Sequence, residues 1–254
     1  MNKFTKTALA TTLLVSGFNT AIAEESEKTV DPSDLTAVNT TASFGMAGNG
    51  DATLSGSLGF ALKNGQMAMT TLEGSLDKDG KYSDSRLQYF HVFNIGNAVV
   101  PKAGVSLDII DNQAFTTAAV GAVAMFNPDV ENLVFFGRAA VLGGGYSDFT
   151  ADIMGESNTD IVGGMAAFYA VWKPGADGTY FWISPEFTYL DGDIETMVPK
   201  VTLTAGTPLS ADAKHWGQIM LESSDTTMKD SRGNKNHDLS GTDTVITATY
   251  KVYF

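Results

Sequence analysis

Histidine transfers protons readily near neutral pH, so the three histidines of the sequence are the first residues to test for catalysis. A hydrolase built on a β-strand would place a serine two residues after the histidine, on the same face of that strand. Phe93 and Gly217 stand at those positions after His91 and His215. Neither histidine is therefore accompanied by a serine nucleophile.

The third histidine, His237, lies beside Asp238 in a polar stretch, and Asp193 and Asp225 lie in two other polar stretches. A hydrolase that pairs His237 with these carboxylates is the least supported hypothesis for function, because aspartate is common in solvated loops. Gly143-Gly144-Gly145 follows an apolar run, but it lacks the helical pattern that must follow a phosphate-binding loop. We expect no enzymatic activity and no cofactor.

Two aspartate-rich stretches, Asp77-Lys78-Asp79-Gly80 and Asp191-Gly192-Asp193, resemble the start of calcium-binding loops. Neither continues to the distal glutamate that completes an EF-hand loop. We therefore interpret both as solvated loops and expect no metal site.

Nine other charged residues interrupt runs of strand length, and they share a face with the polar residues of their runs. The opposite face is free of charge, as with Val105, Leu107 and Ile109 in the run 97–109. A basic side chain that faces lipid near the bilayer midplane costs about 2–4 kcal/mol, so a charge-free face suits lipid and a charged face suits an enclosed lumen. The predicted lumen-lining residues are Glu73, Arg86, Lys102, Asp108, Arg138, Glu186, Lys200, Glu222 and Lys251.

These nine residues comprise five basic and four acidic side chains, so a lumen lined by them is close to neutral. Two hypotheses remain open for their role. They form ion pairs that close the interior, since a buried charge must be paired to be tolerated, or they line a conducting channel of weak selectivity. Glu73 and Arg86 lie on runs joined by one hairpin and are the first candidates for an ion pair.

Alternation with a period of two predicts the strands that must position these side chains. In 179–190, Phe181, Ile183 and Phe187 fall on one face, and Trp182 and Glu186 fall on the other. Most of the runs approach the roughly 9–11 residues that a tilted strand needs to cross a bilayer. The twelve predicted strands are 36–47, 52–62, 66–76, 85–94, 97–109, 113–126, 132–142, 160–173, 179–190, 197–205, 214–222 and 243–254.

The connections between these runs alternate in length. Every second connection is short and suited to a tight turn, as at Lys63-Asn64-Gly65 and Ile95-Gly96. The two longest connections, 143–159 and 223–242, both fall in the other set. Short turns on one side and long loops on the other are typical of a closed transmembrane barrel.

The last run alternates to the final residue, which predicts that the chain end is paired and buried. Tyr250, Val252 and Phe254 lie on its apolar face. A terminal phenylalanine with apolar residues two and four positions before it resembles the closing strand of Gram-negative outer-membrane β-barrel proteins. The resemblance implies that these three residues signal to the barrel-assembly machinery.

The N-terminal residues resemble a secretory signal peptide, with Lys3 and Lys6, a short apolar core, and Ala21-Ile22-Ala23 as the cleavage site. We expect three regions: a signal peptide at 1–23, an acidic and flexible periplasmic tail at 24–35, and a barrel domain at 36–254. The sequence has no cysteine, so an exported protein of this kind relies on its sheet and core for stability. The formal net charge of −13 argues against a nucleic-acid partner.

The predicted fold is therefore all-β, a closed antiparallel transmembrane β-barrel of about twelve strands in the bacterial outer membrane. Its expected partners are outer-membrane lipid and lipopolysaccharide. A small porin-like channel for small solutes is the leading hypothesis for function. The alternative is a plugged structural or surface-recognition barrel that works through its outer loops 143–159 and 223–242.

Overall fold

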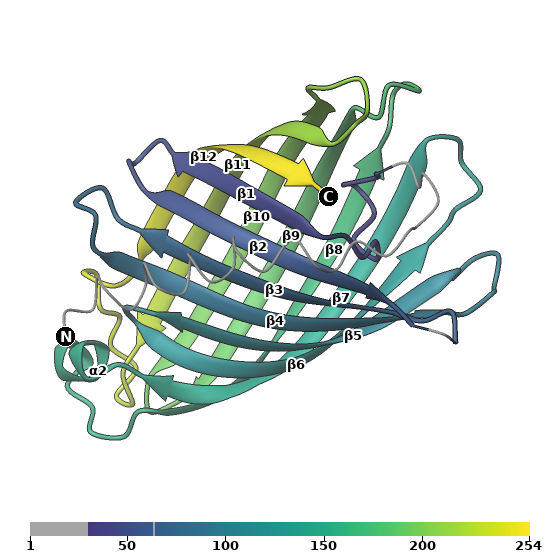
Figure 1. The fold of residues 1–254 in the computed structure, drawn as a ribbon. Coiled ribbons are helices and arrows are strands. Elements are labelled where there is room, and N and C mark those ends of the chain that lie inside the picture. Colours follow the sequence, from purple (N-terminus) through teal and green to yellow (C-terminus); the bar gives the residue numbers. More distant parts are fainter. Residues whose placement is uncertain (1–29, 63) are drawn as a thin grey trace. The chain divides into compact units, whose positions relative to one another are not determined.

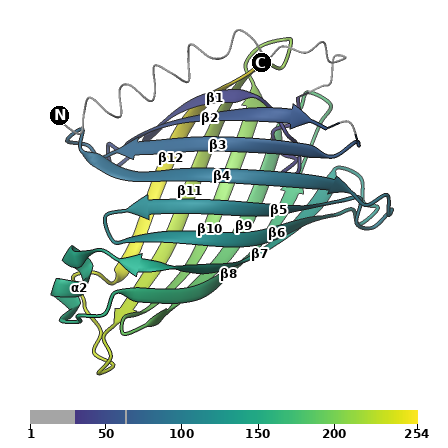
Figure 2. The ribbon, with the colours of Figure 1, turned by 60° about the horizontal axis from the view of Figure 1, so that its bottom comes forward.

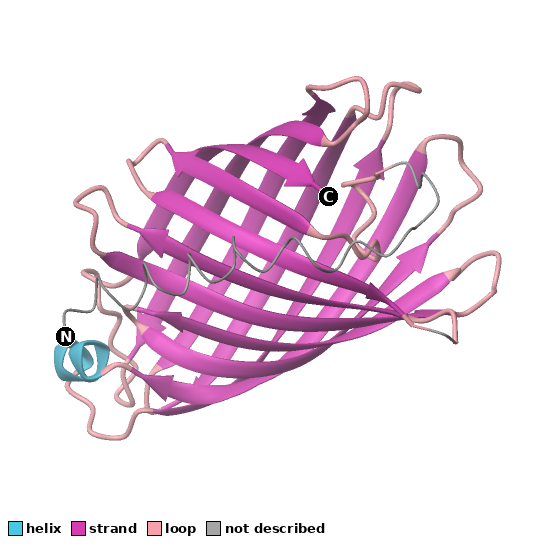
Figure 3. Ribbon diagram, viewed as in Figure 1, coloured by secondary structure: helices cyan, strands magenta, loops and turns pink. Residues whose placement is uncertain are grey.

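The computed structural model describes residues 30–62 and 64–254. The predicted signal peptide (1–23) and residues 24–29 of the predicted tail lie outside these residues. In the described part, residues 31–254 form one unit whose wall is built of antiparallel strands (Figures 1 and 3). Each strand pairs with its neighbours in sequence, and β1 pairs with β12, so the sheet closes on itself. The prediction of a closed barrel with about twelve strands is confirmed.

The strands are β1 (Thr41–Ala47), β2 (Ala52–Ala61), β3 (Met67–Leu76), β4 (Tyr82–Asn94), β5 (Lys102–Asn112), β6 (Phe115–Phe126), β7 (Leu133–Tyr146), β8 (Asp160–Trp172), β9 (Tyr180–Gly192), β10 (Glu195–Pro208), β11 (His215–Lys229) and β12 (Gly241–Tyr253).

The outer surface of the barrel is apolar and exposed, whereas the inner face is largely buried. On β5, Leu107 and Ile109 are 55% and 52% exposed, while the intervening Asp108 is 2% exposed. On β9, Phe181 and Ile183 are exposed in the same way, and Ser184 is buried. A water-soluble protein rarely exposes an apolar surface as continuous as this one, so the outer wall is suited to lipid.

The barrel has two ends that the chain connectivity distinguishes. The inner end holds the start of β1, the end of β12 and the connection 173–179, and the outer end holds the connections 147–159 and 230–240. Figure 2 shows the strands tilted together around the wall, with α2 (Asp148–Met154) beyond the strand ends at the outer end.

Helix α2 was not expected, because 143–159 was predicted to be a loop without a helical pattern. Ser147 is its N-cap and accepts a hydrogen bond from the backbone N–H of Thr150, and Gly155 ends it with φ of 71°. Seven residues are too few to show a helical period in the sequence. No helix of the described residues is long and apolar enough to cross a membrane.

Several strand boundaries also differ from the prediction. For example, β5 begins at Lys102 rather than at residue 97, and β7 ends at Tyr146 rather than at residue 142. β1 begins at Thr41 rather than at residue 36, and β11 continues to Lys229 rather than ending at residue 222. The connection at 191–196 is much tighter than expected, since only Asp193 and Ile194 separate β9 from β10. The loop lengths were overestimated because residues typical of turns were assigned to loops. In β11 the pairing with both neighbouring strands continues through such Ser, Asp and Thr positions.

Candidate functional site: the barrel lumen

All nine predicted lumen residues lie on the interior face, opposite the exposed apolar side chains. The first group joins Arg86 on β4, Asp108 on β5 and Arg138 on β7. The Arg86 guanidinium forms an ion pair with the Asp108 carboxylate, and Nη2 of Arg138 lies 3.4 Å from its second oxygen. Gln88 also donates to Asp108, at 2.7 Å. Asp108 is fully enclosed and is compensated by two cations, as a buried charge requires.

Small residues on β6 allow Arg138 to reach across that strand to Asp108. The interior face of β6 carries Ala119 and Gly121 at this level. A Cβ at Gly121 would lie 3.0 Å from the Ser106 hydroxyl, so the wall here has no room for a side chain. Glycine at this position is therefore explained by close packing beneath the arginine.

The second group lies on β9, β10 and β11. The Lys200 ammonium is 3.0 Å from a Glu186 oxygen and 3.7 Å from a Glu222 oxygen. Lys200 and Glu186 are direct partners in the register of β10 and β9. Ala167 separates Glu186 from Arg138 in the same register row, so the second group continues the first around the wall.

The third group follows a register row through β1. Glu73 pairs with Ser55, Ser55 with Ser43, and Ser43 with Lys251, so Glu73 and Lys251 lie in one interior row with β1 and β2 between them. Glu73 interacts electrostatically with both Arg86 and Lys251. The predicted neighbours Glu73 and Arg86 are partners in register, but the Arg86 guanidinium binds Asp108 instead.

These eight residues alternate in sign around the whole barrel, and together we name them the charge belt. In order of the strands from β3 to β12 they read acidic, basic, acidic, basic, acidic, basic, acidic, basic. From Lys251 on β12 the wall continues through β1 and β2, which carry no belt residue, back to Glu73 on β3, so the alternation of sign is kept at the closure. The belt has no net charge, and its members are Glu73, Arg86, Asp108, Arg138, Glu186, Lys200, Glu222 and Lys251.

Hydroxyl groups line the quarter of the wall formed by β1 to β3. Ser43 and Ser55 lie 2.9 Å apart between their hydroxyl oxygens, and Thr53 and Ser75 share the same distance. Ser57 and Thr71 form a third pair at 2.9 Å. These cross-strand pairs make the lumen polar along β1 to β3.

Apolar side chains fill the opposite half at the outer end, over β6 to β11. Met154 of α2 and Ile194 of the β9–β10 turn are 4% and 1% exposed and pack against Leu190 and Met228. The Tyr146 hydroxyl lies 2.6 Å from that of Thr196, which links β7 to β10 across the cluster. This cluster belongs to β6–β11 and includes no residue of the hydroxyl-lined strands β1 to β3.

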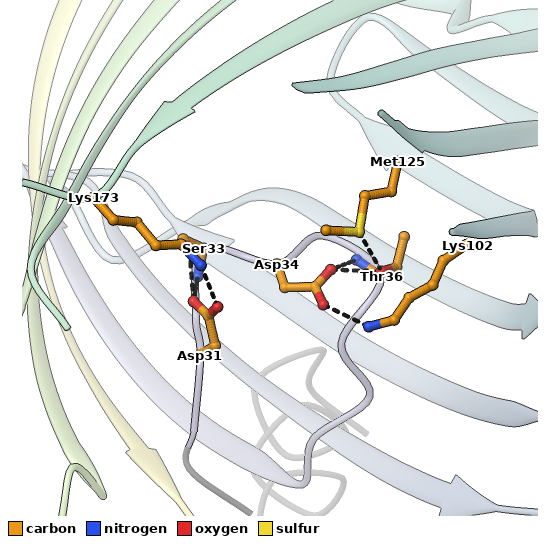
Figure 4. Close-up of polar contacts among 7 residues, drawn as sticks. All are labelled: Asp31, Ser33, Asp34, Thr36, Lys102, Met125 and Lys173. Atoms are coloured by element: carbon orange, nitrogen blue, oxygen red, sulfur yellow. Dashed lines mark hydrogen bonds and ion pairs between the residues drawn. The ribbon is translucent and has the colours of Figure 1, made fainter. Parts of the chain in front are cut away.

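The inner end is occupied by residues 31–36, which we name the inner segment (Figure 4). Asp31 forms an ion pair with Lys173, and Asp34 forms one with Lys102 at 2.8 Å. Ser33 and Thr36 are 1% and 0% exposed. The prediction placed 31–35 in a flexible tail, but these residues contact the barrel wall.

The pKa of Asp31 lies below its usual value of 3.8. Burial alone would raise this pKa, but hydrogen bonds from Lys173 and Ser33, together with the charge of Lys173, outweigh that effect. Asp31 is therefore held in its charged form.

Three aromatic side chains lie beneath the inner segment on the interior face. Tyr180, Trp216 and Tyr253 are buried, and the rings of Tyr180 and Trp216 have centroids 6.1 Å apart. The Trp216 indole donates to the backbone carbonyl of Ala213 at 2.6 Å. The Trp216 side chain therefore points inward, away from the outer face of the barrel.

The histidines take part in no catalytic arrangement among the described residues. His91 bonds to Tyr89 and Gln66, and His215 bonds to Tyr250. His237 hydrogen-bonds to no carboxylate in the described part of the chain. The residues from 30 onward that the structure describes also contain no group of three or more His, Asp or Glu that could hold a metal ion.

The predicted assembly residues lie at the inner end of β12. Val252 pairs with Ala42, and the Phe254 N–H donates to the Thr40 carbonyl at 3.1 Å, so the chain end is paired as expected. The expectation that this end is buried is wrong, because Tyr250 and Phe254 are 46% and 64% exposed on the outer face. The apolar face of a transmembrane barrel points outward, and Tyr253 is the residue that is buried.

The comparisons show the fold. No protein-family model and no curated protein matches the chain. An outer membrane channel from Pseudomonas putida F1 has a TM-score of 0.62 at 14% identity, over 89% of this chain and all of that chain (100%). The NanC porin has a TM-score of 0.59 at 9% identity, over 85% of this chain and 98% of that one. The architecture is that of an outer-membrane β-barrel.

The sequence missed several interior residues. Asp84 faces the lumen and accepts a hydrogen bond from Ser75 at 3.0 Å, but the fourth strand was predicted to begin at residue 85. Asp31 and Asp34 were missed because they lie in an acidic stretch without alternation. One sequence signal could have indicated that this stretch is ordered. An aspartate followed two residues later by serine or threonine is typical of a turn capped by the aspartate side chain, and this pattern occurs twice in 31–36.

Proposed function

We propose that this outer-membrane barrel is a small porin-like channel that passes small polar solutes. The observation that carries this proposal is the charge belt. Apart from the enclosed Asp108, its ion-paired side chains are partly exposed toward an interior that the outer wall shields. Lys200, Arg86 and Glu222 are 27%, 32% and 36% exposed on their side chains. An interior packed only to close the barrel would bury such charges completely, since exposure to a water-sized probe requires space beside them.

Polar lining and small side chains support the same proposal. Ser43, Ser55 and Ser57 leave room along β1 and β2, and their hydroxyls offer both donors and acceptors to a passing solute. The apolar cluster at the outer end lies on other strands, β6 to β11. A path along β1 to β3 is therefore the route that polar solutes would follow. The fold agrees with this proposal, because the two structural neighbours named above are a channel and a porin.

The proposal extends to the protein's surroundings. Outer-membrane lipid and lipopolysaccharide would contact the apolar outer wall, and the barrel-assembly machinery would bind β12. Residues 1–23 would be removed on export. We propose no enzymatic activity, since neither serine nor carboxylate accompanies a histidine in a catalytic arrangement within the described residues.

Single-channel recording tests the function directly. The detergent-folded mature protein is inserted into a planar bilayer, with a heat-shifted gel band as the control for folding. Steady unitary current steps are expected. Silence from a barrel that passes the folding control would contradict the channel proposal.

One observation favours a second candidate, a surface-recognition barrel. The two predicted recognition loops contact each other at the outer end, where a Glu156 carboxylate oxygen accepts from the Ser231 hydroxyl at 2.7 Å and Asn236 donates to the Ile153 carbonyl at 3.4 Å. A cavity of about 460 Å³ lies between them, beside Lys235 and His237. A folded but silent barrel would make this cavity the next place to search for a ligand.

A further inference from the structure

The inner segment and the residues after it cross the inner mouth from one wall to the opposite wall. A Cβ at Gly59 on β2 would lie 3.0 Å from the Val38 side chain, so residue 38 lies directly against β2. Asp34 then reaches Lys102 on β5, and Asp31 reaches Lys173, the residue after β8. Five strands lie between β2 and β8 in either direction around the ring of twelve, so these two walls face each other.

The segment is held mainly by the two ion pairs and by contacts with buried groups. Figure 4 shows Asp31 and Asp34 turned toward Lys173 and Lys102, with Thr36 beside Met125 of β6. The Thr36 hydroxyl lies 4.0 Å from the Met125 sulfur. The Asp31 and Asp34 carboxylates also accept hydrogen bonds from the backbone N–H groups of Ser33 and Thr36, respectively, and these bonds fix two turns in the segment.

We propose that residues 31–36 are a gate that closes the inner mouth of the lumen, held shut by the Asp31–Lys173 and Asp34–Lys102 ion pairs. Both lysines belong to the wall and both carboxylates belong to the segment, so the ion pairs exist only when the segment lies across the mouth. The segment forms no strand with the wall, so no ladder of backbone hydrogen bonds holds it across the mouth. Loss of the two ion pairs would therefore release it into solvent. The gate rests on the proposed channel function, because a gate has meaning only for a path that conducts.

Two readouts separate the gate from the channel. The sequence has no cysteine, so a Ser33→Cys variant carries a single thiol. This thiol is covered in the closed segment, and its labelling by a maleimide reports release of the segment whether or not the barrel conducts. Open probability in a planar bilayer reports the path itself.

The wall lysines are changed together, Lys102→Met and Lys173→Met, because methionine keeps most of their length without the charge. We expect the labelling rate of Cys at position 33 and the open probability each to rise about tenfold, equivalent to about 1.4 kcal/mol. Asp31→Asn with Asp34→Asn tests the same ion pairs from the segment and leaves the wall sequence intact. If one double variant fails the heat-shift control for folding, the other double variant alone still tests the gate.

Lys229→Met is the matched control, since it removes an ion pair with Glu195 (3.5 Å) at the outer end of the barrel. It should leave both readouts unchanged. An unchanged labelling rate in both double variants would overturn the inference that the ion pairs hold the segment. Faster labelling with unchanged open probability of a conducting barrel would overturn the gate, whereas silence in every folded variant would overturn the channel proposal on which it depends.

Discussion

Asp108 is the most enclosed charge of the belt, with 1% of its side chain exposed between two arginines. Asp108→Asn keeps the shape but leaves Arg86 and Arg138 without their shared partner. Removal of one partner from a buried ion pair costs about 3–5 kcal/mol, so we expect the free energy of unfolding to fall by about this amount. Urea unfolding in detergent, followed by tryptophan fluorescence, measures the change.

The matched control is Asp243→Asn, because Asp243 is exposed at the outer end of β12. Such a surface change is expected to alter the free energy of unfolding by less than about 0.5 kcal/mol. Equal stability of the two variants would mean that the arginines find other partners and that the belt contributes little to the fold.

Asp31 makes the proposed gate sensitive to acid. Its pKa in the closed segment lies below 3.8, its usual value, so the closed state binds this proton less readily than the released state does. The ion pair with Lys173 is therefore fully present above the usual pKa and is lost as the pH falls through the lower one. The groups that face Asp31 are Lys173, Ser33, Tyr180 and Tyr253.

We expect the open probability of the channel to rise as the pH falls below about 4. Asp31→Asn should open more at neutral pH and show a weaker rise on acidification. Current recordings at a series of pH values measure both effects. Closure of the wild-type channel in acid would contradict the role of Asp31 and would mean that other groups control the pH dependence.

At the scale of the element, β12 shows how far alternation leads and where it stops. The period-two pattern correctly predicted its strand, its inward Lys251 and the paired end at Phe254. It did not reveal that Phe254 faces outward. The same alternation fits a soluble β-sandwich, whose apolar face points inward, and a transmembrane barrel, whose apolar face points outward. The inner segment could not be predicted for a related reason, since its ion pairs join residues 68 and 142 positions apart in the sequence.

Removal of Phe254 tests the role of this strand in assembly. The truncation loses one hydrogen bond to Thr40 and an exposed aromatic ring at the inner rim. We expect the folded, heat-shifted form in membranes to fall severalfold, while the protein refolded in detergent keeps its barrel. Phe254→Tyr retains the ring and the hydrogen bond and should assemble normally. Equal membrane levels for the truncation and the wild type would contradict an assembly signal at this end.

At the scale of the whole barrel, the formal charges of the belt sum to zero, although each belt residue gives its own part of the wall a positive or a negative charge. Because unlike charges alternate around the lumen, an ion of either sign meets attraction and repulsion in equal measure. We therefore expect little selectivity between cations and anions in the wild-type channel. The reversal potential of a planar bilayer under a KCl gradient should lie close to zero.

Neutralising a single member of the belt should expose this balance. Glu222→Gln leaves a surplus of positive charge and should favour anions, whereas Lys200→Gln leaves a surplus of negative charge and should favour cations. Unit charges about 4 Å apart interact by about 1 kcal/mol in water, so each permeability ratio should shift by roughly fivefold. The two reversal potentials should move in opposite directions, because the two variants remove opposite charges from neighbouring positions on β11 and β10. Shifts in the same direction, or none in either variant, would mean that ions pass without contact with the belt.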